Sequence, residues 1–189
     1  MNTQSHAIIN VALLGRKEKP HLHRYALIGA VLPDFPMFIF WGVETFLFKH
    51  SQEQIWGERY FLPQWQNVFD TFNAIPFILI GLGIGYWLKS DLVILCCMSM
   101  LLHIVGDFFL HHDDGHRHFF PLLQFTFHSP VSYWDPRHYG GIVSIVEILV
   151  TIGASVYLFP RLQSRVMRIA LVVVNLISVL VQMRFTVLA

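Results

Sequence analysis

Histidine and aspartate are concentrated in residues 103–118, a stretch that reads HIVGDFFLHHDDGHRH. Its first half places His103, Asp107 and His111 at intervals of four residues. On an α-helix this spacing aligns the three side chains on one face. Imidazole and carboxylate groups are ligands of zinc, manganese and iron. The pattern therefore predicts a divalent-metal site on one helix face, and the alternative is a buried His–Asp hydrogen bond that locks two helices together.

The second half of the stretch repeats this chemistry around Gly115, where the helix is expected to give way to a turn. A short solvated turn does not normally need four histidines, so we expect two or three of these groups to contact metal. Acids that do not bind metal would orient imidazole rings or act as a general base. The candidate ligands in this half are His111, His112, His116 and His118, and the candidate catalytic bases are Asp113 and Asp114.

The composition of the chain indicates its class. Of its 189 residues, 54% are hydrophobic and 13% are charged, whereas soluble domains average about 25% charged residues. The formal net charge of +1 provides no basic field, so we expect no nucleic-acid partner. The two cysteines are adjacent, at positions 96 and 97, which excludes a CxxC zinc motif. We therefore expect an integral membrane protein in contact with the lipid bilayer.

Several apolar stretches approach the roughly 20 residues that a membrane helix needs. We expect one all-α domain over residues 1–189, an integral membrane bundle of four to five transmembrane helices with a His-rich loop over 111–141. The predicted spans are residues 25–48, 72–88, 91–110, 142–159 and 166–187. Residues 49–68 are polar and aromatic, and we expect them at the membrane interface.

Two polar residues interrupt the apolar N-terminal part of the chain. His6 lies in Ser5–Leu14, which is too short to span a bilayer. Asp34 lies between Pro33 and Pro36 in the first predicted span, and these prolines break the backbone hydrogen bonding. Such a break is tolerated in a membrane only where it faces protein or water. Asp34 is therefore either the cap of the next helix or a metal ligand in an internal pocket.

Three sequence elements carry a family resemblance: Ser5-His6, the segment Gly29-Ala30-Val31-Leu32-Pro33-Asp34, and His103-Ile-Val-Gly-Asp107. Their order and spacing resemble the inner-membrane metal-dependent hydrolases that are also described as LexA-binding, which are in turn similar to zinc-dependent phospholipase C. The resemblance implies that His6, Asp34, His103 and Asp107 are metal ligands. It divides the domain into a hydrolase-like metal-site region, residues 1–125, and two additional spans within residues 142–187.

The chain departs from the family pattern at one position. Where the family has a central His-Ser, this chain has Asn73-Ala74, and an amide is a poorer metal ligand than imidazole. The extra histidines between residues 111 and 118 are expected to compensate. Asp70, three residues before Asn73, either lines the pocket or caps the helix that follows.

Two functions from different classes fit these observations. The first is a membrane-bound metal-dependent hydrolase acting on a phosphoester or lipid-like substrate, with zinc favoured over manganese or iron as the divalent metal. The second is a non-catalytic membrane protein that binds or hands on metal ions. Haem or quinone binding is disfavoured, because the predicted spans 72–88, 142–159 and 166–187 contain no histidine. We expect the protein in a bacterial-type inner (plasma) membrane.

Lysine and arginine favour a cytoplasmic N-terminus. With that orientation, eight of the 13 Lys and Arg residues lie on the cytoplasmic side, in the direction of the positive-inside rule. The His-rich loop then faces away from the cytoplasm. Glu147, early in the fourth predicted span, is expected either to snorkel toward the membrane surface or to pair with Arg137 or Arg117.

Overall fold

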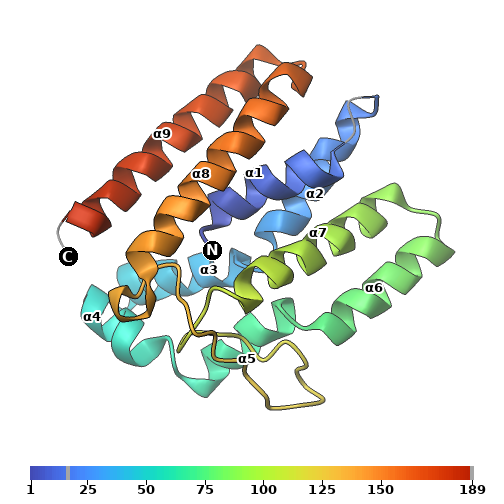
Figure 1. Cartoon of the computed structure of the whole chain (residues 1–189). Helices are drawn as coiled ribbons and strands as arrows, with labels where there is room; N and C mark the ends of the chain where they lie inside the picture. The colour runs from blue at the N-terminus through green and yellow to red at the C-terminus, as the bar shows by residue number, and fades with distance from the viewer. Residues whose placement is uncertain (16–17, 188–189) are drawn as a thin grey trace.

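The computed structural model describes residues 1–15 and 18–187, with side chains placed as far as Gln182. These residues are 72% helix, and the described part of the chain contains no strand. Figure 1 shows long helices above a lower layer of short helices and a long loop. The prediction of an all-α fold is therefore confirmed. Three cations counted in the predicted charge asymmetry, Arg16, Lys17 and the side chain of Arg184, lie outside the described residues.

Four helices are long and apolar enough to cross a membrane. Only 17 to 33% of the most apolar window of each is buried inside the protein, so most of their side chains face outward. Broad exposed apolar surfaces of this kind mark contact with membrane or protein partners. These helices are Pro63–Trp87, which combines α5 (Pro63–Phe72) and α6 (Ile75–Trp87), then α7 (Asp91–Phe108), α8 (Gly140–Leu158) with the 3₁₀ turn Phe159–Arg161, and α9 (Arg165–Val187).

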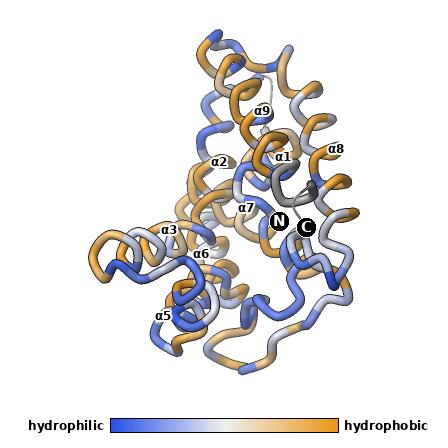
Figure 2. The backbone as a smooth tube through the Cα atoms, turned by 90° about the vertical axis from the view of Figure 1, so that its left-hand side faces the viewer, coloured by the Kyte–Doolittle hydropathy of each residue, from blue (hydrophilic) through white to orange (hydrophobic). Residues whose placement is uncertain are grey.

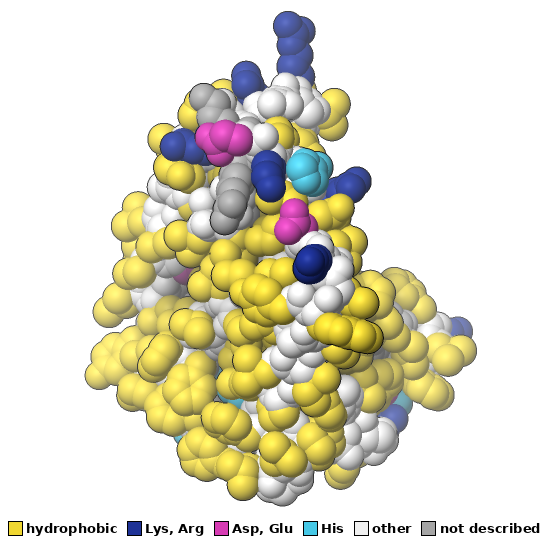
Figure 3. All heavy atoms as spheres, turned by 90° about the vertical axis from the view of Figure 1, so that its right-hand side faces the viewer, with side chains coloured by type: hydrophobic (Ala, Val, Ile, Leu, Met, Phe, Trp, Pro, Cys, Tyr) yellow, Lys and Arg dark blue, Asp and Glu magenta, His cyan; other side chains and the backbone are white. Residues whose placement is uncertain are grey.

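Polar and apolar residues are distributed along the molecule as expected for helices that contact a membrane. In Figure 2 the apolar helices lie between more hydrophilic segments, the largest of which is at the lower end with the long loop and α5. Figure 3 shows charged side chains gathered at the upper end, above a broad hydrophobic surface. The fold therefore presents an apolar belt between two polar ends.

A fifth candidate span is broken in the middle. The 3₁₀ turn Pro20–Leu22 leads into α2 (His23–Val31), and α3 (Phe35–Gly42) continues through a π-helical turn, Val43–Leu47. The two halves are bent by 55° at the break. The prolines that flank Asp34 cause the bend, because proline cannot donate a backbone hydrogen bond.

The helix α1 (Thr3–Leu14) packs against α2, α7 and α8. Asn10 Nδ2 donates to the carbonyl oxygen and to Oγ of Ser99, at 2.8 and 3.0 Å, and so fastens α1 to α7. A Cβ on Gly29 would lie 2.2 Å from the carbonyl oxygen of Cys96. Glycine is therefore required for α2 to approach α7 this closely.

An aromatic core holds α3 against α5. A short helix, α4 (Gln52–Gln54), and the π-helical turn Ile55–Arg59 fold over it. The core consists of the buried residues Phe40, Ile55, Tyr60 and Phe69. Because α3 begins directly after Pro33-Asp34, this packing fixes the position of the break.

Residues 109–139, the long loop between α7 and α8, are tied back to the end of α7. Ser129 N donates to the carbonyl oxygen of His111 at 3.0 Å, and Ser129 Oγ donates to that of Phe109 at 2.6 Å. Ser129 is 1% exposed. The loop ends in the 3₁₀ turn Pro136–His138, directly before α8. The His-rich segment is therefore held at one end of the bundle.

Candidate metal centre

Three side chains from two helices that are distant in sequence form a buried cluster. His6 comes from α1, and His103 and Asp107 come from α7; one ligand atom of each lies within 4.8 Å of the others. His6 and His103 are 0% exposed, and Asp107 is 3% exposed. Two imidazoles and a carboxylate are the donor set of many catalytic zinc sites. The chemistry of these residues therefore fits a divalent metal.

α1 can bring His6 to this cluster because α7 presents a glycine there. A Cβ on Gly106 would lie 3.0 Å from Cε1 of His6. The rings of His6 and His103 stack with 3.6 Å between centroids and 15° between planes. Nε2 of His6 lies 2.8 Å from Oδ1 of Asp107. Its Nδ1 is buried and has no hydrogen-bond partner among the described residues.

The hydrogen bonds of His103 decide which of its nitrogens is available as a ligand. Its Nδ1 lies 2.8 Å from the carbonyl oxygen of Ala30, and because a carbonyl can only accept, Nδ1 must carry the proton. In the neutral ring Nε2 then carries a lone pair. Nε2 lies 2.9 Å from Oδ2 of Asp107 and 3.4 Å from Oδ1 of Asp34. It is buried without a hydrogen bond of acceptable geometry to any described residue.

Asp34 directly precedes α3, in its N-cap position, but its side chain does not cap the helix. Within the described structure its carboxylate accepts no hydrogen bond from the first turn of that helix. Its Oδ2 instead accepts from Oγ1 of Thr3 at 2.5 Å, while Oδ1 faces His103. Of the two roles that the sequence leaves open, the geometry favours a contribution to the metal centre.

His111 reaches the cluster from beyond the helix. α7 ends at Phe108, so the prediction that His111 shares its helical face is wrong. Its Nε2 nevertheless lies 3.3 Å from Oδ1 of Asp107, because the loop turns back at this point. The backbone amino group of Met1 lies 2.6 Å from the same carboxylate oxygen. Oδ1 of Asp107 therefore contacts His6 on α1, His111 on the loop after α7, and the amino group of Met1.

Asp114 lies on the far side of His111. Its Oδ2 is 3.0 Å from Nδ1 of His111 and accepts from Nε1 of Trp134 at 2.9 Å. Burial opposes the ionisation of this carboxyl, but the contacts with His111 and Trp134 outweigh it, so the pKa of Asp114 lies below its usual range. Its Oδ1 is buried and lacks a hydrogen-bond partner in the described part of the chain.

His116 and His118 lie in a separate group. Nδ1 of His116 is 3.5 Å from Oδ1 of Asp70, and Arg117 pairs with the same carboxylate. His118 Nδ1 donates to the carbonyl oxygen of Asn73 at 3.2 Å, and burial lowers the pKa of His118 to about 4. The structure therefore places His116 beside Asp70 and His118 beside the backbone of Asn73, rather than in the three-residue cluster.

Asp70 and Asn73 support the backbone around the cluster. Asp70 is inside α5 and does not cap α6, which begins after Ala74 without a side-chain cap among the described residues. Asn73 Nδ2 donates to the carbonyl oxygens of Phe69 and Pro33 at 3.0 and 3.3 Å. The residue in the family's histidine position thus holds the backbone of the break that carries Asp34.

His112 and Asp113 lie outside the buried cluster. His112 Nδ1 donates to the carbonyl oxygen of Ser129 at 2.6 Å, and its ring stacks on His138 with 3.6 Å between centroids. His128 lies edge-on to His112 at 6.1 Å, and the side chain of Asp113 is 60% exposed. The sequence interpretation did not include His128 or His138, because no spacing relates them to the others.

The partners of Glu147 also differ from the prediction. Glu147 Oε1 accepts from the backbone nitrogen and from Nδ2 of Asn2, at 3.0 and 2.8 Å. The two arginines named in the prediction pair elsewhere, Arg137 with Asp135 on the same loop and Arg117 with Asp70 on α5. Glu147 therefore fixes the start of α1 through Asn2, the residue directly before Thr3.

Fold and site together define an all-helical protein with apolar candidate spans and a buried His/Asp cluster near one end of the bundle. Comparison of the chain with protein-family models, with curated proteins and with solved structures finds no match. The resemblance to the inner-membrane hydrolases therefore stays a prediction from three short motifs.

Proposed function

We propose that the protein is a membrane-bound metal-dependent hydrolase of a phosphoester in a lipid-like substrate, located in a bacterial-type inner membrane. The observation that carries the proposal is the buried Nε2 of His103, which lies 2.9 and 3.4 Å from the carboxylates of Asp107 and Asp34. A lone pair that faces two anions away from water is repulsive unless a cation lies between them. A metal ion at this point would meet nitrogen and oxygen donors from His6, His103 and Asp107, which is a donor set typical of zinc.

The chain's own residues would hold the metal through a supported set of ligands. His6, His103 and Asp107 are the ligands, and Asp34 adds a second carboxylate beside His103. Supporting contacts fix the orientation of these groups, since Ala30 holds the His103 ring and Thr3 holds Asp34. Nitrogen and oxygen donors in this combination favour zinc. When bound, the metal would polarise a phosphoryl oxygen and lower the pKa of a bound water toward about 7.

We assign Asp114 to act on the attacking water through His111, because the His111 ring lies between Asp114 and the cluster. The pKa of Asp114 lies below the usual range, so it is ionised at neutral pH. Oδ2 is engaged by His111 and Trp134, while Oδ1 is left to accept a hydrogen bond. Asp113 is the weaker candidate because its side chain is largely in solvent.

One observation favours the second function, a non-catalytic protein that hands on metal ions. His112, His128 and His138 form an outer group on the long loop, one residue from His111, which contacts the buried cluster. Surface histidines next to a closed buried site would suit collection and transfer of a divalent ion.

Metal content and hydrolysis separate the two functions. The protein is purified in detergent, its zinc, manganese and iron are quantified, and hydrolysis of bis(p-nitrophenyl) phosphate and of phospholipid is followed. Enzyme function predicts tightly bound metal at a fixed ratio and hydrolysis that His103→Ala abolishes. The matched control is His21→Ala, at an exposed histidine before α2, which should keep both metal and activity.

Two results would contradict the hydrolase proposal. Metal that exchanges within minutes, together with no hydrolysis of either substrate, would instead indicate metal handling. A protein that binds no divalent metal, in wild-type form and with added zinc, would mean that the cluster is a structural hydrogen-bond network.

A further inference from the structure

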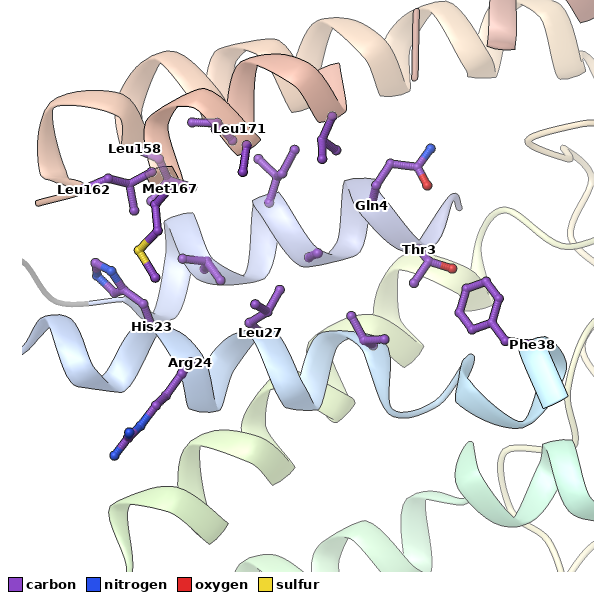
Figure 4. Close-up of a pocket in the computed structure, with 16 residues that line it drawn as sticks. Thr3, Gln4, His23, Arg24, Leu27, Phe38, Leu158, Leu162, Met167 and Leu171 are labelled. Carbon is purple, nitrogen blue, oxygen red and sulfur yellow. The ribbon is translucent and has the colours of Figure 1, made fainter. Parts of the chain in front are cut away.

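An apolar groove runs along the outside of α1. Its walls are α2 on one side and the α8–α9 pair on the other, as Figure 4 shows. The cavity measures about 510 Å³, within the roughly 300–1,000 Å³ range of small-molecule sites. Its lining is almost entirely apolar and includes Ala7, Val11, Leu27, Ala170 and Val174.

One end of this groove touches the metal centre. Thr3 and Phe38 line that end, and His23, Leu162 and Met167 lie around the other (Figure 4). The hydroxyl of Thr3 donates to Oδ2 of Asp34 at 2.5 Å. An occupant of the groove would therefore end beside a residue whose other carboxylate oxygen faces His103.

The groove has the length of a lipid tail. Thr3 and Val11 are eight residues apart on α1, which corresponds to about 12 Å at about 1.5 Å per residue. Half of the roughly 30 Å hydrocarbon core of a bilayer is about 15 Å. A linear chain from one leaflet would consequently fill the groove from end to end.

The surroundings of the groove also favour a hydrocarbon occupant. Leu27 and Met167 on its walls are 44 and 48% exposed, so the groove opens sideways onto the apolar belt. α9, which forms one wall, is a candidate span. In a membrane an opening at this depth meets lipid tails rather than water.

We propose that this groove binds one acyl chain of a membrane phospholipid and thereby lays the polar head of that lipid against Thr3 and Asp34. The inference rests on the proposed function, because it makes a lipid phosphoester the substrate of the metal centre. The apolar contacts along α1, α2 and α9 hold the tail, while the ester group lies at the polar end of the groove.

Photo-crosslinking tests occupancy of the groove without requiring catalysis. The full-length protein is reconstituted in vesicles of phosphatidylethanolamine and phosphatidylglycerol that contain a phospholipid with a diazirine at mid-chain. Crosslinked peptides are identified by mass spectrometry. We expect crosslinks on α1 around Ala7 and Val11 as well as on the outward face of α8, for example at Leu149.

Substitutions that fill the groove allow lipid crosslinking to be compared with that of the wild type. Ala170→Trp and Val174→Trp should reduce crosslinking of the α1 peptide relative to the α8 peptide by at least about 10-fold, the scale on which apolar pockets discriminate. The control is Ile169→Trp, at a position 64% exposed and outside the groove lining, which should leave this ratio unchanged. Equal ratios in all three variants, or no α1 crosslink in the wild type, would overturn the proposal.

Rates on two substrates distinguish the failure of this inference from the failure of the proposed function. If both hold, the ratio of phospholipid to bis(p-nitrophenyl) phosphate hydrolysis falls at least about 10-fold in Ala170→Trp and Val174→Trp but not in Ile169→Trp. An unchanged ratio with active enzyme would refute the groove and retain the hydrolase. An α1 crosslink that Ala170→Trp and Val174→Trp reduce, in a protein without hydrolysis, would retain the groove and refute the enzyme.

Discussion

The imidazole of His103 is held by groups that the spacing of its own helix does not provide. The Ala30 carbonyl fixes its proton on Nδ1, and the break after α2 brings Asp34 to within 3.4 Å of Nε2. Oδ2 of Asp107, four residues further along α7, lies 2.9 Å from the same nitrogen. For metal binding, the negative charge of Asp34 is therefore more important than the position of this residue before α3.

Asp34→Asn tests this charge directly. The substitution keeps the size of the side chain and an oxygen that can accept from Thr3, but it removes one anion from the cluster. We expect zinc affinity to fall by about 10- to 100-fold, the effect of losing one supporting group at a metal site. Isothermal titration of the metal-stripped protein with zinc measures the change.

The matched control is Asp91→Asn at the opposite, exposed end of α7. It makes the same chemical change far from the cluster and should leave zinc affinity unaltered. If Asp34→Asn bound zinc as tightly as the wild type, Asp34 would be a structural residue that only receives the hydroxyl of Thr3.

Sequence reasoning located the parts of this site that local spacing or order reveals. The interval between His103 and Asp107 is a helical repeat, so it could be predicted. The contact of His103 with Ala30 could not be predicted, because it is made by a backbone carbonyl, which every residue type has. His111 was assigned to the wrong element for a similar reason: the pattern of four continues in the sequence after the helix has ended at Phe108.

The contact between the Ala30 carbonyl and His103 requires that α2 pack closely against α7. The helices touch where Gly29 faces the carbonyl oxygen of Cys96, one residue before Ala30. Gly29→Ala would place a Cβ 2.2 Å from that oxygen and force the helices apart. We expect the protein to be destabilised by about 1–3 kcal/mol, the usual cost of overpacking, and to bind zinc less tightly because the Ala30 carbonyl moves away from His103.

The control for this substitution is Gly83→Ala on α6. A Cβ there would meet no described atom within 4 Å, and replacing a helical glycine by alanine typically gains about 0.5–1 kcal/mol. Thermal unfolding of both variants in the same detergent gives the comparison. An unfolding midpoint for Gly29→Ala equal to or above that of Gly83→Ala would contradict the tight α2–α7 contact.

The end of the long loop depends on one carboxylate. Asp135 accepts from the backbone nitrogen and guanidinium of Arg137 and lies 2.8 Å from Nδ1 of His138. Because these hydrogen bonds favour the ionised form, the pKa of Asp135 lies below its usual range. A carboxyl whose pKa is lower in the folded than in the unfolded chain stabilises the fold above the unfolded pKa. This contribution is lost as the pH falls from about 4 toward the folded value.

Asp135→Asn should therefore lower the unfolding temperature at pH 7 and have a progressively smaller effect below about pH 4. Unfolding midpoints of wild type and variant between pH 7 and pH 3 measure this difference. A difference that stays constant with pH would mean that the loop needs only the hydrogen-bond geometry of residue 135 and not its charge.

At the scale of the whole molecule, the sequence predicted the helical class and most of the boundaries of the long apolar helices. Apolar length reveals these features directly, and α8, predicted from residue 142, begins at Gly140. The grouping of residues 1–24 at one end of the molecule is wrong. Charge counting treated residues 1–24 as one segment on one side, but α1 separates the basic turn at Pro20–Leu22 from Met1, which contacts Asp107 at the end of the His-rich loop. Counting charges cannot detect that α1, although too short to span a bilayer, separates Met1 from the basic turn at Pro20–Leu22.

The corrected arrangement gives a prediction about orientation. The basic residues Lys19 and Arg24 border the same end as the α8–α9 turn with Arg161 and Arg165, so the positive-inside rule places this end in the cytoplasm. Met1 and the metal centre then lie toward the opposite side.

In a variant with Cys96 and Cys97 replaced by alanine, Glu53→Cys on α4 should react with a membrane-impermeant thiol reagent in intact cells. Gln163→Cys, in the α8–α9 turn, should react only after the membrane is permeabilised. The opposite labelling pattern would put the His-rich loop in the cytoplasm, whereas labelling of both cysteines in intact cells would contradict a bundle that crosses the membrane.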